Sequence, residues 1–255
     1  VMIWLIGNKG MLGSDVESLL NQNEFEYLSS DLKVDIINYE QLQDFVSGKK
    51  IDWIINCAAY TAVDRAEDEP DRAFQINAEG VLNIARTAKE KKATLIHIST
   101  DYVFDGEKDG SYTEEDKPNP TGVYGKSKLQ GEIYIQDVLT GYYIIRTAWL
   151  YGLHGSNFVY TMLKLFREKE SIRVVSDQWG SPTYAKDLAK AIVKILKSKS
   201  SAYGIFHFTN EGKTNWYEFA EEIYKKTKEY ELVKPTIDII PISTDEYSTK
   251  AKRPK

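Results

Sequence analysis

The sequence predicts an α/β fold: a doubly wound parallel sheet with a smaller, interleaved C-terminal lobe. Apolar runs of strand length alternate with segments of helical periodicity over residues 1–148. The first run leads directly into a glycine turn, and later runs end in small or hydroxyl-bearing residues. Ligands of such sheets bind beyond the carboxyl ends of the strands, so a binding site is expected along that edge. Strands are expected at residues 1–6, 25–29, 52–56, 95–100 and 143–147.

Composition excludes several classes of protein. The 255 residues are 42% hydrophobic and 28% charged, which suits a globular chain with a full core. The net charge of −5 is spread over both signs, so neither a nucleic-acid groove nor a membrane-binding face is expected. Cys57 is the single cysteine, which rules out an internal disulfide and a cysteine-built metal site, and no metal is expected. Because no signal peptide or membrane-spanning run is visible, we expect a cytoplasmic protein, and the sequence leaves a homodimer open.

A glycine turn follows the first predicted strand. Gly7, Gly10 and Gly13 stand between this strand and a helical pattern that includes Val16. Backbone N–H groups at a helix start attract phosphate, and glycines let a dinucleotide pyrophosphate approach the backbone. The spacing G-x-x-G-x-x-G differs from the usual G-x-G-x-x-G fingerprint, but its place after the first strand predicts cofactor binding.

The next two predicted strands add candidate cofactor contacts. Ser29 ends the second strand, where a ribose-binding carboxylate is normally sought. Small hydroxyls there leave room for a 2′-phosphate, whereas Asp31 could bind a free 2′-hydroxyl, so NADPH and NADH both remain open. Cys57 is expected to be a packed thiol, and the small Ala58 and Ala59 after it permit close approach of a cofactor.

Residues 67–92 are expected to be helical, with a break near Pro70. Asn77 falls within this segment. Its amide could order a water chain towards a catalytic lysine, or it could only satisfy local backbone groups. The sequence does not choose between these alternatives.

The fourth predicted strand carries the candidate chemistry. It ends at Thr100, and a helical pattern that begins near Tyr124 places Lys128 one turn later on the same face. An ammonium beside a phenol favours the phenolate, so we expect Lys128, together with a cofactor cation, to lower the pKa of Tyr124 from about 10. The spacing Tyr-x-x-x-Lys occurs four times in the chain, but only here does it follow a Ser-Thr strand end.

Beyond Trp149 the pattern becomes less regular. We interpret residues 1–148 as a dinucleotide-binding domain, to which segments near 172–198 return, and residues 149–255 mainly as a substrate-binding lobe. Helices are expected near 157–170, 184–198 and 215–229, and short strands near 172–175, 204–208 and 237–240.

Five sequence blocks point together to one known family. They are residues 56–64 with 66–67, 99–106, 124–128, 146–149 and 177–183. On these blocks the chain resembles the extended short-chain dehydrogenase/reductases, and more narrowly the dTDP-4-dehydrorhamnose reductases, over nearly its whole length. The resemblance implies a Rossmann-like fold and a reduction that uses NADPH or NADH.

The resemblance also implies roles for matching positions. Thr100 would polarise the C4 carbonyl of the substrate, Tyr124 would be the general acid, and Lys128 would bind the nicotinamide ribose. The implied sugar contacts are Val63, Thr100, Asp101, Tyr102 and Trp149. The implied cofactor contacts are Gly10, Met11, Leu12, Asp35, Ile36, Ala59, Tyr60 and Thr61, to which we add Gly7, Gly13, Ser29, Cys57, Ala58 and Asn77.

Two features depart from the family pattern. Tyr60 stands where relatives often have histidine, which is expected to change packing over the cofactor rather than the chemistry. The chain stops at residues 252–255, where family members usually continue for a few dozen residues, so part of the substrate lobe is expected to be missing. Arg253 in this last segment is a candidate contact for the substrate diphosphate.

The leading hypothesis is hydride delivery to C4 of a dTDP-linked 4-keto-6-deoxy sugar, with protonation by Tyr124, which gives dTDP-L-rhamnose. A reductase of another nucleotide-linked 4-keto sugar stays open. A dehydratase is disfavoured, because Asp101-Tyr102 follows the threonine in place of an acidic pair. The contrasting class is a non-catalytic dinucleotide-binding regulatory subunit, as in methionine adenosyltransferase. The complete set of Thr100, Tyr124 and Lys128 favours an enzyme.

Overall fold

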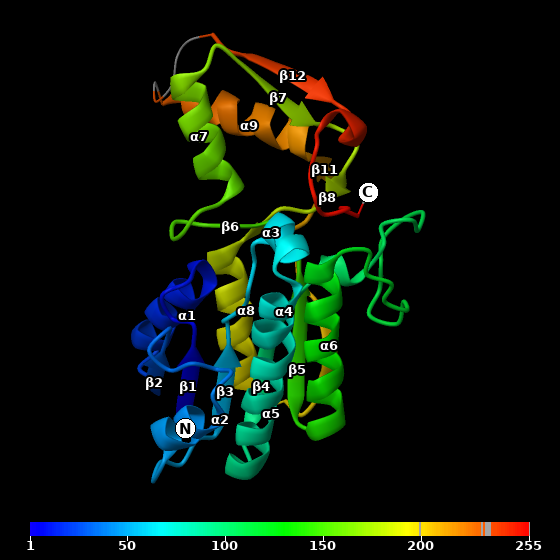
Figure 1. Ribbon diagram of the computed structural model, residues 1–255. Coiled ribbons are helices and arrows are strands. Elements are labelled where there is room, and N and C mark those ends of the chain that lie inside the picture. The colour runs from blue at the N-terminus through cyan, green and yellow to red at the C-terminus, as the bar shows by residue number, and fades with distance from the viewer. Residues whose placement is uncertain (199, 231, 233–235, 255) are drawn as a thin grey trace.

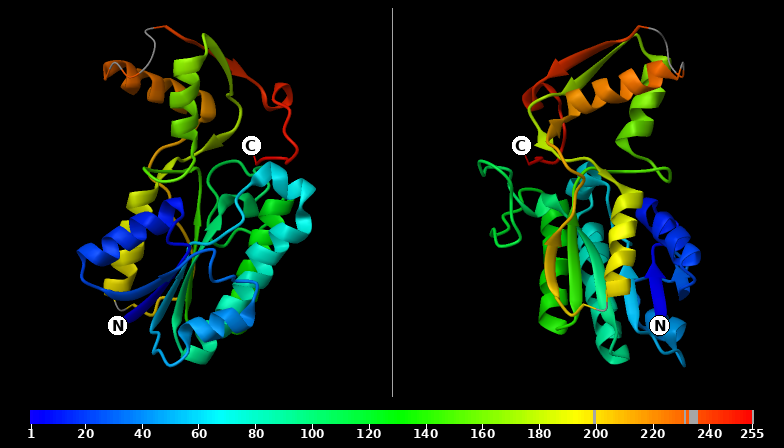
Figure 2. Two further views of the ribbon diagram at one scale, coloured as in Figure 1. Left: turned by 60° about the vertical axis from the view of Figure 1, so that its left-hand side comes forward. Right: turned by 180° about the vertical axis from the view of Figure 1, so that it is seen from behind.

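The computed structural model describes residues 1–198, 200–230, 232 and 236–254. Within these residues the predicted sheet is confirmed: its order is β10-β5-β4-β3-β1-β2, and every neighbouring pair is parallel (Figures 1 and 2). The chain leaves β1 towards β2 on one side and returns to β3 on the other, which creates a topological switch point beside β1. The strands are β1 (Met2–Ile6), β2 (Glu26–Ser30), β3 (Trp53–Asn56), β4 (Thr94–Thr100), β5 (Tyr142–Thr147) and β10 (Gly204–His207).

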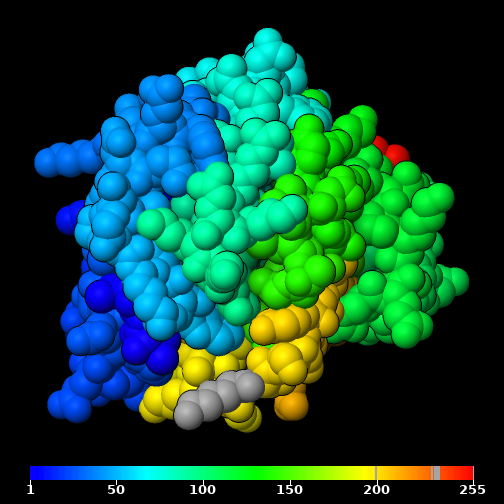
Figure 3. Space-filling view, turned by 90° about the horizontal axis from the view of Figure 1, so that it is seen from below, coloured from blue at the N-terminus to red at the C-terminus, as the bar shows by residue number. Residues whose placement is uncertain are grey.

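Helices cover both faces of this sheet because each strand carries apolar side chains on both sides. Leu42, Ile84 and Ile135 belong to the core on one face, and Val16 and Leu188 belong to the core on the other. The first face packs against α2 (Tyr39–Val46), α5 (Gly80–Lys91) and α6 (Val123–Val138), and the second against α1 (Met11–Gln22) and α8 (Ala185–Ser198). Seen from below, residues of α2, α5 and α6 lie side by side, from blue through teal to green (Figure 3).

The helical segment that follows β3 is interrupted, as predicted. Its pieces are α3 (Val63–Asp68), α4 (Pro70–Phe74), a π-helical turn (Gln75–Glu79) and then α5. Glu69 separates α3 from α4 because its backbone, at φ −126° and ψ 54°, is not helical and Pro70 follows it. The π-helical turn holds Asn77.

The smaller lobe lies beyond the carboxyl ends of the sheet strands (Figure 1). Its own core includes Phe166, Ile172 and Ile223. It is built from α7 (Phe158–Glu168), α9 (Trp216–Glu229) and the parallel pair β7 (Ser171–Val175) and β12 (Asp238–Ile242). Short paired segments connect the two parts: β6 (Leu150–Tyr151) with β9 (Thr183–Tyr184), and β8 (Trp179–Gly180) with β11 (Thr214–Asn215).

The segments that return to the sheet domain differ from the expected range near 172–198. Strand β7 pairs with β12 in the smaller lobe, because its alternate residues Ile172 and Val174 face the core there. Helix α8 packs on the sheet, and β10 then adds an edge strand to the sheet beside β5. The domain limits at 148 and 149 stay a prediction. Among the described residues, no helix combines the length and apolarity needed to cross a bilayer.

Candidate active site

A cavity of about 570 Å³ lies at the carboxyl ends of β1, β3, β4 and β5, and we call it the reaction cavity. It brings together the three predicted catalytic residues, Thr100, Tyr124 and Lys128. Its other predicted lining residues are Gly10, Met11, Leu12, Cys57, Ala59, Thr61, Val63, Asp101, Tyr102 and Trp149. The catalytic, cofactor and sugar positions therefore share one space.

The glycine turn has the shape that a phosphate cradle needs. Gly7 adopts φ +80°, and a Cβ there would come within 2.8 Å of the Ala58 nitrogen. A Cβ on Gly13 would lie 2.0 Å from the carbonyl oxygen of Gly7, so only glycine lets α1 start this close to the turn. The N-cap of α1 is Gly10, which has no side chain that could accept a hydrogen bond. The N–H groups of the first turn are therefore not capped by this residue and can bind an anion. These features fit the pyrophosphate of a dinucleotide cofactor.

Thr100 and Tyr124 meet at the end of β4. The Thr100 hydroxyl donates to Asp101 Oδ1 at 3.1 Å and accepts from the Tyr102 N–H at 3.2 Å, and its side chain also forms a hydrogen bond with that of Tyr124. The Tyr102 ring packs edge-on against the Tyr124 ring, with centroids 5.5 Å apart. Helix α6 can approach this closely because Gly125 has no side chain. A Cβ there would lie only 2.1 Å from the Tyr102 carbonyl oxygen.

The protein's own groups do not lower the pKa of Tyr124, and the share of the expected lowering that a cofactor cation would supply stays a prediction. Burial raises the pKa of Tyr124 above 10.0, the hydrogen bond with Thr100 opposes this, and the charges of Asp101 and Tyr102 add to the rise. The Lys128 Nζ donates to the carbonyl oxygen of Ile98 at 2.7 Å. Tyr124 is therefore a neutral phenol at neutral pH.

Two buried charges stand behind the catalytic residues, and sequence reasoning missed both. Arg146 donates to both carboxylate oxygens of Glu132 at 2.6 to 3.2 Å, and Ser99 donates to the same carboxylate. The side chains of Arg146 and Glu132 are 3% and 0% exposed. The one available signal was the position of Glu132, four residues after Lys128 on α6. Burial lowers the pKa of Lys128 to about 8, and the charge of Glu132 opposes this.

Several predicted cofactor residues lie outside the lining of the reaction cavity and support it instead. The Ala58 N–H donates to Asn56 Oδ1 at 3.0 Å. Asn77 is fully buried; its Oδ1 accepts from the Tyr60 N–H at 2.8 Å, and its Nδ2 donates to the Tyr60 carbonyl and to Ser127 Oγ. Of the two alternatives for Asn77, these contacts match the local backbone role. The amide joins the loop after β3 to α6.

Three predicted cofactor contacts belong to β2 and the loop that follows it. Ser29 is half-buried opposite Leu5 of β1. Asp35 accepts from the Ile37 N–H at 3.1 Å, and the Ile36 side chain packs so closely on α5 that a Cβ on Gly80 would come within 2.7 Å of it. The lining of the reaction cavity contains none of Ser29, Asp35 and Ile36, and neither does the lining of the second cavity beside it.

Arg253 does not lie free for a diphosphate. Its guanidinium donates to both oxygens of Asp64, at 2.7 and 3.2 Å, and it also forms a hydrogen bond with Tyr102. The neighbouring Lys250 pairs with Asp68 at 2.6 Å. The last described residues are thus docked on α3, and the structure gives Arg253 a partner within the protein.

Trp149 joins the two parts of the protein at the edge of the reaction cavity. It adopts φ +47° and stacks on Trp216, with ring centroids 3.5 Å apart and planes 11° from parallel. A Cβ on Gly180 would come within 2.6 Å of the Trp149 ring, so glycine there makes room for the stack. The stacked indole lines the reaction cavity.

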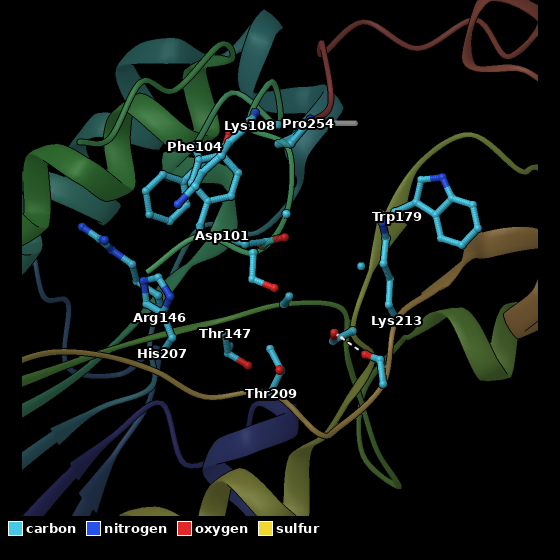
Figure 4. A pocket seen from close by; sticks show the side chains of 18 of the residues that line it. Asp101, Phe104, Lys108, Arg146, Thr147, Trp179, His207, Thr209, Lys213 and Pro254 are labelled. Atoms are coloured by element: carbon cyan, nitrogen blue, oxygen red, sulfur yellow. Dashed lines mark hydrogen bonds between the residues drawn. The ribbon is translucent and has the colours of Figure 1, made fainter. Parts of the chain in front are cut away.

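A second cavity of about 620 Å³ adjoins the first and shares Asp101, Thr147 and Ala148 with it. We call it the adjoining cavity. Figure 4 shows Trp179 and Lys213 on one side of it, opposite Phe104 and Lys108. The Lys213 Nζ lies 4.9 Å from the centroid of the Trp179 ring, and Lys108 forms an ion pair with Asp116 at 2.6 Å. Residues of three sequence blocks, 99–106, 146–149 and 177–183, line this cavity, but the sequence did not show that these distant loops enclose one space.

Known proteins resemble this chain along its length. A dTDP-4-dehydrorhamnose reductase of Aggregatibacter actinomycetemcomitans is 39% identical over 98% of this chain and 87% of its own length. A dTDP-4-keto-6-deoxy-D-glucose reductase of Streptomyces niveus is 37% identical over 87% of this chain and 77% of its own. The crystal structure of dTDP-4-dehydrorhamnose reductase from Bacillus anthracis in complex with NADP is 41% identical, covers 99% of this chain and 88% of its own, and superposes with a TM-score of 0.92. The RmlD substrate binding domain matches residues 1–255, and the chain belongs to that family.

Proposed function

We propose that this chain reduces the C4 keto group of dTDP-4-dehydro-6-deoxy-L-mannose to dTDP-L-rhamnose, with NADPH or NADH as the reductant. The observation that carries this proposal is the meeting of Thr100, Tyr124 and Lys128 with the glycine turn in the reaction cavity. The names of the relatives support the substrate, and the NADP complex of one of them supports the cofactor. A cytoplasmic location and a homodimer stay predictions from the sequence.

The chemistry of the site follows from its protonation states. When bound, the nicotinamide supplies the hydride. Tyr124 holds its proton at neutral pH because burial raises its pKa, and it donates that proton to the oxygen of the C4 carbonyl. Thr100, beside it, would turn its O–H from Asp101 to the same oxygen and stabilise the charge that develops there. Lys128, which lines the same cavity, would hold the ribose of the cofactor.

The adjoining cavity offers a place for the rest of the substrate. A sugar held between Thr100 and Trp149 would extend its diphosphate past Asp101, since both cavities share that residue. Lys213 supplies positive charge on one side of this space, whereas the charge of Lys108 on the opposite side is paired with Asp116. Lys213 is therefore our candidate diphosphate contact in place of Arg253.

A second substrate is favoured by one specific finding. The Streptomyces niveus relative is named for the reduction of a dTDP-4-keto-6-deoxy-D-glucose. This sugar has the same C4 ketone and differs in configuration elsewhere on the ring. The pair Thr100 and Tyr124 addresses the ketone alone, so contacts such as Trp149 and Val63 have to decide between the sugars.

The test is oxidation of NADPH and NADH, followed by absorbance, against a panel of nucleotide-linked 4-keto sugars. We expect rapid oxidation with the L-mannose-configured keto sugar, and a loss of roughly 10²- to 10⁴-fold in kcat for Tyr124→Phe with cofactor binding retained. Tyr160→Phe is the matched control: Tyr160 also precedes a lysine by four residues, but it is exposed and donates to the Leu153 carbonyl. Cofactor binding without oxidation for every sugar would favour the regulatory-subunit hypothesis instead.

A further inference from the structure

His97 lies in β4 directly beneath the catalytic residues, and the proposed chemistry does not use it. The ring is fully buried between two neighbours from other elements. Its Nδ1 lies 3.0 Å from Asn56 Nδ2 on β3, and its Nε2 lies 3.4 Å from Lys128 Nζ on α6. An imidazole nitrogen this close to an amine favours either the charged or the neutral amine, according to whether that nitrogen carries a proton.

The tautomer of His97 follows from its hydrogen-bond partners. Asn56 Oδ1 already accepts from the Ala58 N–H at 3.0 Å, so its Nδ2, which can only donate, faces the ring. His97 Nδ1 must therefore be the acceptor, and the ring proton is on Nε2. A doubly protonated ring would set two donors against each other. Burial and the charge of Lys128 agree with this, since both hold the pKa of His97 well below 6.5.

This tautomer presents an N–H to Lys128. The amine already donates to the Ile98 carbonyl at 2.7 Å, so the side chain is held in place from one direction. An ammonium at that point would meet the Nε2–H donor to donor, whereas a neutral amine would accept from it. We propose that His97, with its tautomer fixed by Asn56, is a positioning residue that destabilises the ammonium form of Lys128.

The other groups around Lys128 do not account for this effect. Glu132, on the same helix, favours the ammonium, but Arg146 on β5 neutralises much of its charge through the buried pair. The Cys57 thiol after β3 has a pKa raised to about 12 by burial, so it is uncharged at neutral pH. Burial lowers the pKa of Lys128 to about 8, the direction in which the N–H of His97 also acts.

The consequence rests on the proposed function. Because the pKa of Tyr124 lies above that of Lys128, the ammonium can pass a proton towards Tyr124 after each turnover. High pH removes that proton, so activity should fall as pH rises through the pKa of Lys128. His97 would then set the upper end of the pH range in which the enzyme works.

The first experiment determines the tautomer in the native protein without any variant. Long-range proton–nitrogen correlation spectra of the cofactor-free chain separate protonated from unprotonated imidazole nitrogens, and the chain has only three histidines to assign. We expect His97 to be neutral with Nε2 protonated. A proton on Nδ1, or a charged ring at neutral pH, would overturn the proposal.

The second experiment measures Lys128 itself. The carbon-13 shift of the lysine ε-carbon, assigned with Lys128→Met, gives its pKa in cofactor-free native protein, in His97→Gln and in His154→Gln. The amide of the introduced glutamine in His97→Gln can turn its oxygen to the amine, so we expect the pKa of Lys128 to rise by about one unit or more, a tenfold change in proton affinity. The exposed His154 serves as the control, and its substitution should leave the pKa of Lys128 unchanged. An unchanged or lower pKa in folded His97→Gln would refute the proposal.

The pH profile of kcat/KM provides the functional readout. In His97→Gln its high-pH limb should move upward with the pKa of Lys128, whereas a purely structural role would lower activity at every pH. An unmoved limb would count against the proposal. The two spectroscopic measurements need no turnover, so a chain that reduces no sugar would refute the proposed function and leave the test of His97 intact.

Discussion

The buried pair of Glu132 and Arg146 allows a quantitative prediction about stability. It joins α6 to β5 behind the catalytic residues, and Ser99, next to Thr100, donates to the same carboxylate. Arg146→Met removes the cation and leaves a carboxylate that is 0% exposed, with Ser99 as its remaining hydrogen-bond donor among the described residues. Breaking a buried pair in this way costs about 3–5 kcal/mol of unfolding free energy. That is a large part of the roughly 5–15 kcal/mol typical of a folded protein.

The assay is urea unfolding followed by far-UV circular dichroism, with the free energy of unfolding extrapolated to water. The control is Lys190→Met, which breaks the ion pair of Lys190 with Asp187. These two side chains are 59% and 36% exposed, so the variant should lose less than about 1 kcal/mol of unfolding free energy. The double variant Glu132→Gln/Arg146→Met should lose less than Arg146→Met alone, because no buried charge is left unpaired. If Arg146→Met loses no more unfolding free energy than Lys190→Met, the buried pair does not stabilise the contact between α6 and β5.

Three further changes test other parts of the structure. Gly13→Ala should weaken NADPH binding at least tenfold, about 1.4 kcal/mol, in calorimetry, because its Cβ would lie 2.0 Å from the Gly7 carbonyl oxygen. The control Gly48→Ala, where a Cβ would meet no atom within 4 Å, should leave NADPH binding unchanged. Equal affinities of the two variants for NADPH would contradict the phosphate cradle. Trp216→Ala should raise the KM for the sugar several-fold, about 1 kcal/mol, since the stack that orients Trp149 is lost; an unchanged KM would remove Trp149 from the sugar site. Hydrogen bonds from Tyr112, the Glu107 N–H and Asn119 lower the pKa of Asp105 to about 2, so its contribution to loop stability is present above about pH 4 and lost as pH falls towards 2. Hydrogen exchange of residues 105–119 in native protein and Asp105→Asn measures this, and identical acid sensitivity would be the contrary result.

Much of the sheet could be predicted because its signals are local. Buried parallel strands are short continuous apolar runs, and Gly7 and Gly13 mark the turn that follows the first of them. The meeting of Thr100 with Tyr124 and Lys128 could be predicted as well, because a strand end and a helix start fix their places. The positions of β7 and β10 could not, since pairing between distant segments decides them.

The properties that sequence reasoning missed depend on tertiary contacts. The pKa of Tyr124 rises because of burial, which no spacing reveals. Arg146 looks like an ordinary strand residue until α6 places Glu132 against it. His97 looks like a packing residue until both Asn56 and Lys128 are seen to touch its ring.

The central claim is that this chain passes a hydride to the C4 carbon of a nucleotide-linked keto sugar. The most direct measurement uses NADPH deuterated at C4 of the nicotinamide, one face at a time, with dTDP-4-dehydrorhamnose, and locates the label in the sugar product by mass spectrometry and NMR. We predict that one of the two labelled cofactors places a single deuterium on C4 of the sugar, and that Tyr124→Phe forms this product far more slowly. A product without deuterium from either cofactor, or label at another carbon, would contradict the account.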